Sequence, residues 1–227
     1  MKRFLLLLAA LVPLGTFAQT GTGTRTLYLV RHGMYERVAG ADNKVANALN
    51  PLGREQAEFI AARLAALPIK FDTVVSSEFT RARETGDIIA AKLGQQCQRD
   101  GLLNETTPPG IGWDTVKYPL VAGAEAQLDA AWARYSQPTP QAARNDLLAC
   151  HGNVIRWFVC RALGLDSQRF TRMDIANASL TIITIHPDGT ARLLVFNDVS
   201  HVPLAKQTWF GSKDAPFWPM SETSATK

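Results

Sequence analysis

Short apolar runs alternate with segments of helical periodicity along this chain, and this alternation limits its fold more than any other feature. The runs at residues 26–30, 71–75 and 147–150 have the length and side-chain types of buried strands. Helical patterns cover 52–67, 78–93, 121–135 and 154–163. Strands and helices in alternation predict an α/β domain with a largely parallel sheet and helices on both of its faces.

A β-hairpin is predicted near the end of this domain. Residues 180–185 and 191–196 flank the turn signal Pro187-Asp188-Gly189-Thr190, so the hairpin adds antiparallel strands to the sheet. We assign residues 26–206 to the domain and 207–227 to a C-terminal tail with aromatic residues at 209, 210, 217 and 218.

The first 18 residues have the three parts of a secretory signal peptide. Lys2 and Arg3 precede a nine-residue apolar run from Phe4 to Val12, and Ala18 ends a short segment of small residues. Pro13 interrupts the run well before the ~20 apolar residues that a spanning helix needs. We therefore expect cleavage near Ala18, a Gly/Thr linker at 19–25, no stable membrane insertion afterwards, and a periplasmic or secreted protein.

The charge balance gives little support for a nucleic-acid partner. The formal charge of +4 falls to +2 once Lys2 and Arg3 are removed with the leader, and the remaining basic residues form no run. A protein that binds the phosphate backbone usually gathers its basic residues on one face. No nucleic-acid partner is predicted.

The cysteines and histidines do not form a framework. Cys97, Cys150 and Cys160 are an odd number, and we favour buried thiols over a bridge between Cys150 and Cys160, which stays open. The three Cys and four His also lack the spacings of metal ligands, so no metal or other cofactor is predicted.

Chemically reactive side chains follow three of the predicted strands. The carboxyl ends of parallel strands meet at one edge of a sheet, where ligands collect. Guanidinium groups match phosphate oxygens, and a neutral imidazole among them can attack phosphorus. The residues in question are Arg31-His32-Gly33, Ser76-Ser77 with Arg81, and His151-Gly152.

Five stretches in the same order resemble the histidine phosphatase (phosphoglycerate mutase-like) superfamily. These are TLYLVRHG from Thr26, NPLGREQA from Asn50, SSEFTRARET from Ser76, CHGNVIR from Cys150, and Asn177-Ala178-Ser179. RHG alone is a weak signal, but all five together are specific. The chain most resembles the serine/threonine phosphatase subgroup called phosphoglycerate mutase family member five.

The resemblance implies a three-layer αβα sandwich and a two-step reaction through a phosphohistidine. By motif position, His32 is the nucleophile, while Arg31, Arg81 and His151 bind and stabilise the phosphoryl oxygens. Glu105 matches the proton donor to the leaving group. It lies in the irregular segment 103–119, and the alternative is a solvated loop carboxylate, with Asp114 the next candidate acid.

Departures from the mutases favour a phosphatase. Thr106-Thr107-Pro108-Pro109-Gly110 follows Glu105, so residues that would hold a phosphoglycerate carboxylate are not evident. We expect an exported, metal-independent phosphomonoesterase acting on a phosphoprotein or a small phosphate ester. A phosphomutase and a catalytically weak phospho-ligand binding protein are the alternatives. The oligomeric state stays open, with a dimer among the alternatives.

Two further residues have open roles. Arg37 either supplements the phosphate pocket or lies on a solvated loop. For His201 we favour packing or a surface turn over support of the site.

The leader is directly testable. We expect the mature chain to begin near Gln19 and, in a Gram-negative host, to fractionate with the periplasm, because the targeting segment is removed on export. Intact mass and N-terminal sequencing of the fractionated protein measure this, and an intact Met1 form confined to the cytosol would contradict it.

Overall fold

The computed structural model describes residues 23–209, and within them six strands form a single sheet. The strand order is β3-β2-β4-β1-β5-β6. The first four strands in this order, β3, β2, β4 and β1, are parallel to their neighbours. Strand β5 is antiparallel to β1, and β6 is antiparallel to β5. The predicted mostly parallel sheet with its terminal hairpin is confirmed. The strands are β1 (Arg25–Arg31), β2 (Thr73–Ser76), β3 (Cys97–Arg99), β4 (Arg144–Cys150), β5 (Leu180–Ile185) and β6 (Ala191–Asp198).

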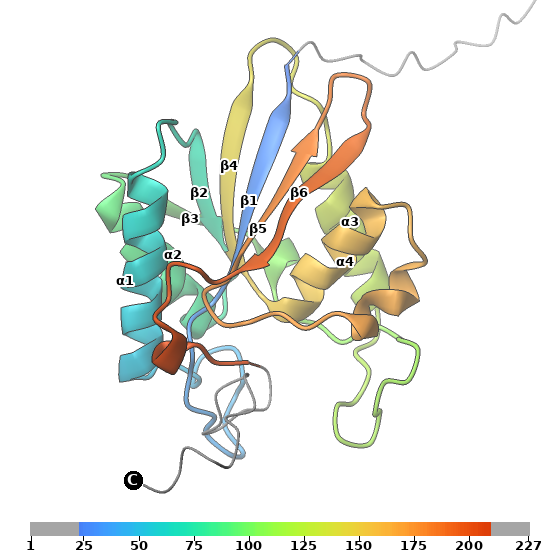
Figure 1. Ribbon diagram of the computed structural model, residues 1–227. Coiled ribbons are helices and arrows are strands. Elements are labelled where there is room, and N and C mark those ends of the chain that lie inside the picture. Colours follow the sequence, from blue (N-terminus) through green and yellow to red (C-terminus); the bar gives the residue numbers. More distant parts are fainter. Residues whose placement is uncertain (1–22, 210–227) are drawn as a thin grey trace, which may run out of the picture.

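Helices cover both faces of the sheet, as predicted. Helices α1 (Pro51–Ala65) and α2 (Thr80–Lys92) lie on one face, and α3 (Ala124–Tyr135) and α4 (Gly152–Ala162) lie on the other (Figure 1). The expected helices are all present, with ends that differ by a few residues. Gly94 and Gly164 follow α2 and α4 with φ of +66° and +65°, the left-handed conformation that ends helices.

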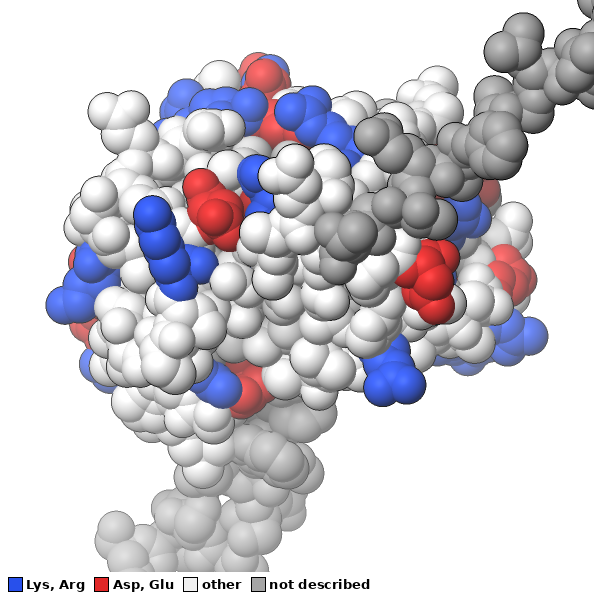
Figure 2. All heavy atoms as spheres, turned by 90° about the horizontal axis from the view of Figure 1, so that it is seen from above, with Lys and Arg blue, Asp and Glu red and all other residues white. Residues whose placement is uncertain are grey.

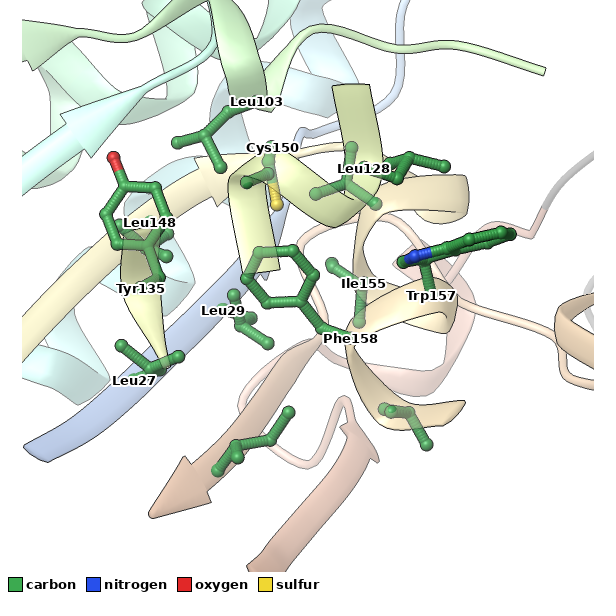
Figure 3. Packing of buried hydrophobic residues seen from close by; sticks show 14 of the residues in the cluster. Leu27, Leu29, Leu103, Leu128, Tyr135, Leu148, Cys150, Ile155, Trp157 and Phe158 are labelled. Atoms are coloured by element: carbon green, nitrogen blue, oxygen red, sulfur yellow. The ribbon is translucent and has the colours of Figure 1, made fainter. Parts of the chain in front are cut away.

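The core lies between the sheet and its helices. Leu29 of β1 and Leu148 and Cys150 of β4 lie near Ile155 and Phe158 of α4 (Figure 3). On the opposite face, side chains of β1, β2 and β4 pack against α1 and α2. Burying each large aliphatic or aromatic side chain contributes roughly 1.5–3 kcal/mol. The two cores hold the strand ends in place.

Strand β3 was missed by the sequence interpretation. It has three residues, Cys97, Gln98 and Arg99, none of them fully buried, and it pairs with β2 at the edge of the sheet. A strand that takes its stability from backbone pairing carries no apolar run, so periodicity gives no signal for it.

The last residues of the linker expected at 19–25 belong to the folded domain. Gly23 is buried and pairs with Thr139, and the carbonyl of Thr24 accepts a hydrogen bond from Arg144 N at 2.9 Å. Arg25 already begins β1. These residues belong to the fold because they extend the register of β1 beyond its apolar part.

Several predictions lie wholly or partly outside the described residues. The signal peptide and the start of the linker do, as does the tail from residue 210. Thr208, assigned to the tail, contacts the domain through Gln56 and Asn177. Among residues 23–209 there is no helix with the length and apolar character to span a bilayer.

The state of the thiols agrees with the sequence interpretation. All three cysteines are free, with Cys150 and Cys160 buried in the core around α4. On the face seen from above, at the end of the sheet opposite the carboxyl ends of the parallel strands, basic and acidic side chains are interspersed (Figure 2).

A close backbone contact ties α1 to the segment after β1, and it gives a stability prediction. A Cβ at Gly53 would lie 1.8 Å from the carbonyl oxygen of Met34. We expect Gly53→Ala to cost about 1–3 kcal/mol or more in the free energy of unfolding, since backbone must move to admit the methyl group. Equilibrium urea unfolding measures it.

Gly101→Ala is the matched control. A Cβ there meets nothing closer than 3.6 Å, an ordinary contact. Equal stability of the Gly53→Ala variant and the wild type would show that the backbone yields without cost.

Candidate active site

Three neighbouring strands end at the same edge of the sheet and bring the predicted residues together. β2, β4 and β1 are adjacent, with Arg31 opposite Cys150 and Ser76 opposite Ala149. The pairing continues for one further residue, because His32 N and Ser77 N donate to the carbonyls of β4 at 3.0 Å. The segments that follow β1 and β3 lie at this same end, the lower one in Figure 1.

His32 is buried, and both of its ring nitrogens have a defined role. Nδ1 lies 2.8 Å from the carbonyl oxygen of Gly33, which can only accept, so Nδ1 carries the proton. Nε2 therefore has a lone pair, and Arg81 Nε donates to it at 3.2 Å. Burial, followed by the charges of Arg81 and Arg31, holds the pKa of His32 well below its usual value of 6.5. The imidazole is neutral, as a nucleophile must be.

The backbone around His32 is fixed from several elements. Its carbonyl accepts from Asn177 Nδ2 at 3.1 Å and from Ala178 N at 3.3 Å. Gly33 N donates to Thr85 of α2, and Met34 N donates to Gln56 of α1 at 2.8 Å. Groups held in this way need no reorganisation when a ligand arrives.

Arg31 and Arg81 supply positive charge beside the imidazole. Arg31 is buried and donates through Nη1 to the carbonyl of Ile175, while its Nε has no partner within the described residues. Burial lowers the pKa of Arg31 to about 10, so it stays charged at neutral pH. Arg81 Nη1 donates to Asn43, and its guanidinium lies 4.6 Å from the centre of the Tyr35 ring. Both guanidinium groups line a cavity of about 270 Å³ with His32.

His151 lies beside His32 and is fully buried, and the residues that line the cavity in the free site do not include it. The two ring centres are 5.1 Å apart. His151 Nε2 is 2.8 Å from Ser77 Oγ, and Nδ1 has no partner among residues 23–209. Burial, with the nearby Arg81, His32 and Arg31, holds the pKa of His151 well below 6.5.

Glu105 lines the same cavity, so the loop places its carboxyl at the site rather than in open solvent. Burial raises the pKa of Glu105, although Arg81, Arg156 and Arg31 act in the opposite direction. Asp114 does not line the cavity; it is exposed and accepts from the backbone of Val116 and Lys117 within its own turn. Of the two candidate acids, only Glu105 is in reach of the site.

The sequence model of the histidine phosphatase superfamily (branch 1) matches residues 27–143 and 122–199 of this chain. The chain belongs to the histidine phosphatase superfamily. The resemblance drawn from the five motifs is confirmed. The αβα sandwich that it implies agrees with the observed sheet and the helices on its two faces.

Curated relatives of this histidine phosphatase are mitochondrial serine/threonine-protein phosphatases named PGAM5. Those of Rattus norvegicus and Homo sapiens are each 37% identical over 196 residues, covering 82% of this chain and 66% of theirs. That of Caenorhabditis elegans is 35% identical over 192 residues, covering 80% and 66%. The chain thus spans just under two thirds of the length of these relatives.

Solved structures share the fold. A phosphoglycerate mutase from Plasmodium falciparum has a TM-score of 0.56 at 26% identity, covering 80% of this chain and 95% of its own. A mutant phosphoserine phosphatase from Entamoeba histolytica in complex with phosphoserine has a TM-score of 0.59 at 19% identity, covering 79% and 100%.

Sequence reasoning missed Arg156 of this histidine phosphatase. It lines the cavity and donates to the carbonyls of Gly152 and Met173 at 3.2 and 3.1 Å and to Asn153 Oδ1 at 2.5 Å. A signal was present: Arg156 is a charged residue within the buried run of α4, and such residues are rare without a partner. The other cavity residues, such as Tyr35, Asn43 and Asp174, lie on irregular segments and had no comparable signal.

Arg37 and His201 lie in different places. Arg37 is exposed and lines the cavity. His201 lies away from it; Nε2 donates to the carbonyl of Ala178 at 2.9 Å, and Nδ1 accepts from Arg63 at 3.2 Å. His201 therefore supports, through Ala178, the segment that contacts the His32 carbonyl, which is the role that the sequence interpretation did not favour.

The depressed pKa of His32 predicts how stability depends on pH. Its unfolded-state pKa is about 6.5, so below that value the unfolded chain binds a proton that the folded chain does not. Stability contributed by neutral His32 is present above about pH 6.5 and is lost as pH falls below it. We expect His32→Asn to reduce the stability lost between about pH 7.5 and 5.5 by up to about 1.4 kcal/mol.

Urea unfolding of the wild type and the variant at several pH values measures this difference. The comparison uses the change with pH, not the absolute stability, which the substitution itself alters. Parallel curves for the two proteins would mean that His32 titrates alike in both states.

Proposed function

We propose that this chain is an exported, metal-independent phosphomonoesterase that acts through a phosphohistidine on His32. The observation that carries the proposal is the neutral His32, whose Nε2 lone pair accepts from Arg81 at a cavity that Arg31 and the carboxyl group of Glu105 also line. The motif similarity to serine/threonine-protein phosphatases supports a phosphoprotein substrate, and the size of the cavity fits a phosphorylated side chain or a small ester equally well.

In the first step, His32 Nε2 attacks phosphorus while the bond to the leaving oxygen breaks. Arg81 Nε, which donates to Nε2 in the free site, must turn its hydrogen bond to a phosphoryl oxygen. Arg31 offers an unpartnered buried Nε–H to another. Burial raises the pKa of Glu105, and in the proposed step its protonated carboxyl group gives its proton to the leaving alkoxide.

In the second step, water attacks the phosphohistidine and restores His32. Glu105 is now a carboxylate and accepts the proton of the attacking water, so it returns to its starting form. Phosphate leaves with both charges neutralised by the arginines. Because Arg31, Arg81 and Arg156 supply this charge, the reaction as proposed needs no divalent ion.

The covalent step gives the first functional prediction. In excess EDTA we expect turnover to continue, and quenching without acid should show a protein mass increased by one phosphoryl group. The adduct should be labile to acid and stable to base, as a phosphoramidate is. Intact-mass and peptide mass spectrometry should place it on His32.

His32→Ala should abolish both the adduct and hydrolysis. His186→Ala is the matched control, because His186 lies in the turn between β5 and β6 and does not line the cavity. An adduct that persists in His32→Ala on Ser76 or Ser77, or turnover that needs added metal, would contradict the proposed chemistry.

Glu105→Gln gives the second functional prediction. The variant keeps the side-chain size but has no proton to give, so hydrolysis of phosphoserine or a sugar phosphate should fall by ~10²- to 10⁴-fold in kcat. p-Nitrophenyl phosphate should lose much less, since nitrophenolate leaves without protonation. Steady-state rates on both substrates measure the difference.

Asp114→Asn is the control, because that carboxylate serves only its own turn. Equal losses on both substrates for Glu105→Gln would assign Glu105 to binding. Unchanged rates would remove it from the mechanism.

A further inference from the structure

Ser77 is a fully buried residue whose hydroxyl group makes a complete set of hydrogen bonds next to His151. Ser77 Oγ is 2.9 Å from Asn104 Oδ1, 3.1 Å from the backbone N of Phe79 and 2.8 Å from His151 Nε2. A hydroxyl group has one proton to donate and two lone pairs to accept with. Which partner receives the proton decides the state of His151.

The position of Asn104 settles the direction of these bonds. Its Oδ1 accepts from the backbone N of Glu78 at 2.9 Å, and its Nδ2 donates to the Glu78 carboxylate at 3.2 Å. The amide is therefore oriented with its oxygen toward Ser77. Since Oδ1 cannot donate, the proton of Ser77 points to Asn104.

The remaining two contacts of Ser77 must then be accepted by its oxygen. One is donated by Phe79 N and the other by His151 Nε2. His151 thus carries its proton on Nε2, and in the neutral ring Nδ1 has a lone pair. This nitrogen is buried, has no partner within residues 23–209, and belongs to a ring whose centre is 5.1 Å from that of His32.

A lone pair on Nδ1 would repel the oxygens of a phosphoryl group bound against His32. We propose that Ser77 and Asn104 are positioning residues that fix the proton of His151 on Nε2, so that phosphoryl binding is coupled to uptake of a proton at His151 Nδ1. The inference rests on the proposed phosphate site. A dianionic ligand takes this proton from solvent, and a monoanionic ligand supplies it from its own hydroxyl group. Either way His151 becomes an imidazolium that donates to Ser77 and to a phosphoryl oxygen.

The surroundings of His151 explain why the proton arrives only with the ligand. Arg81 of α2 and Arg31 of β1 are cationic neighbours that oppose a second positive charge, and His32 is neutral. Phe79 packs edge-on against the ring, with ring centres 5.2 Å apart. Glu105 and Asp174 are the carboxyl groups that line the cavity, and Glu105 acts on the same two arginines. The negative charge of a bound phosphoryl group reverses this balance.

Calorimetry with inorganic phosphate counts the protons directly. Titrations of the whole protein at about pH 8, in buffers of different ionisation enthalpy, give the number of protons taken up per phosphate bound. We expect a value close to one for the wild type. Correspondingly, its affinity for the dianion should fall about tenfold per pH unit above that pH.

Ser77→Ala removes the acceptor of the Nε2 proton, which lets the ring place its proton on Nδ1 and donate to phosphate directly. Proton uptake should then fall toward zero, and the pH dependence of the affinity should flatten. Asn104→Ala should do the same by another route, because the Ser77 hydroxyl is freed to donate to Nε2. Ser77→Thr keeps the hydroxyl group and should restore the uptake.

Ser76→Ala is the matched control. Ser76 is the preceding buried serine, but its hydroxyl donates to the carbonyl of Ser77 and accepts from Arg99, with no contact to His151. It should keep the uptake of the wild type. Nitrogen-15 spectra of labelled histidine provide an independent measurement: His151 should show the Nε2-protonated tautomer in the free protein and the imidazolium after phosphate is added.

The outcomes separate this inference from the proposed function. Phosphate binding with no proton uptake, or a free protein with its proton on Nδ1, overturns the inference and leaves the phosphohistidine mechanism intact. Failure of the wild type to bind phosphate overturns both. Loss of uptake in the Ser77→Ala and Asn104→Ala variants but not in Ser76→Ala supports it.

Discussion

The neutral state of His32 is the condition on which the rest of the site depends. A histidine in water is partly protonated near neutral pH, and a protonated ring has no lone pair for phosphorus. Here the ring is buried with two guanidinium groups beside it, and all three effects disfavour the charged form. The cost of placing arginines in a buried site is met by hydrogen bonds to carbonyls, such as that from Arg31 to Ile175. In the proposed reaction the same arginines bind the dianionic phosphoryl group.

Much of this arrangement follows from the sequence because it uses strand ends. The strands β1, β2 and β4 are recognisable as apolar runs, and the residues just after them must meet at one edge once the strands are parallel. Contacts that depend on a side-chain direction were beyond prediction. Arg156 folds back along α4 to reach Gly152, and Ser77 turns its hydroxyl group to His151. Both depend on rotamers that neighbouring elements select. Strand β3 could not be predicted because it contributes backbone pairing to the sheet and no buried side chains to the core, so it leaves no apolar run in the sequence.

The chemistry and the choice of substrate are carried by different parts of the molecule. His32, Arg81 and His151 lie at strand ends and helix starts, where backbone hydrogen bonds fix them. Much of the cavity wall comes from irregular segments, such as Arg37 and Asn43 after β1 and Trp113, Lys117 and Tyr118 after β3. Loops of this kind vary between relatives more than the elements that they connect. Similarity to the phosphatases and the mutase therefore supports phosphoryl-transfer chemistry more strongly than it supports any particular substrate.

Asp174 and Lys117 illustrate how these loops act on a substrate. Both line the cavity and both are exposed, so the mouth presents opposite charges around a strongly cationic interior. In the proposed reaction, Arg31, Arg81 and Arg156 hold the phosphoryl group, and the remainder of the ester lies toward Asp174 and Lys117. Exposed charges at such a rim contribute little to affinity but can favour one orientation of a zwitterionic or peptide substrate over another. Selectivity of this enzyme is thus expected to follow the groups that flank the phosphate, because the phosphate itself is recognised in the same way in every substrate.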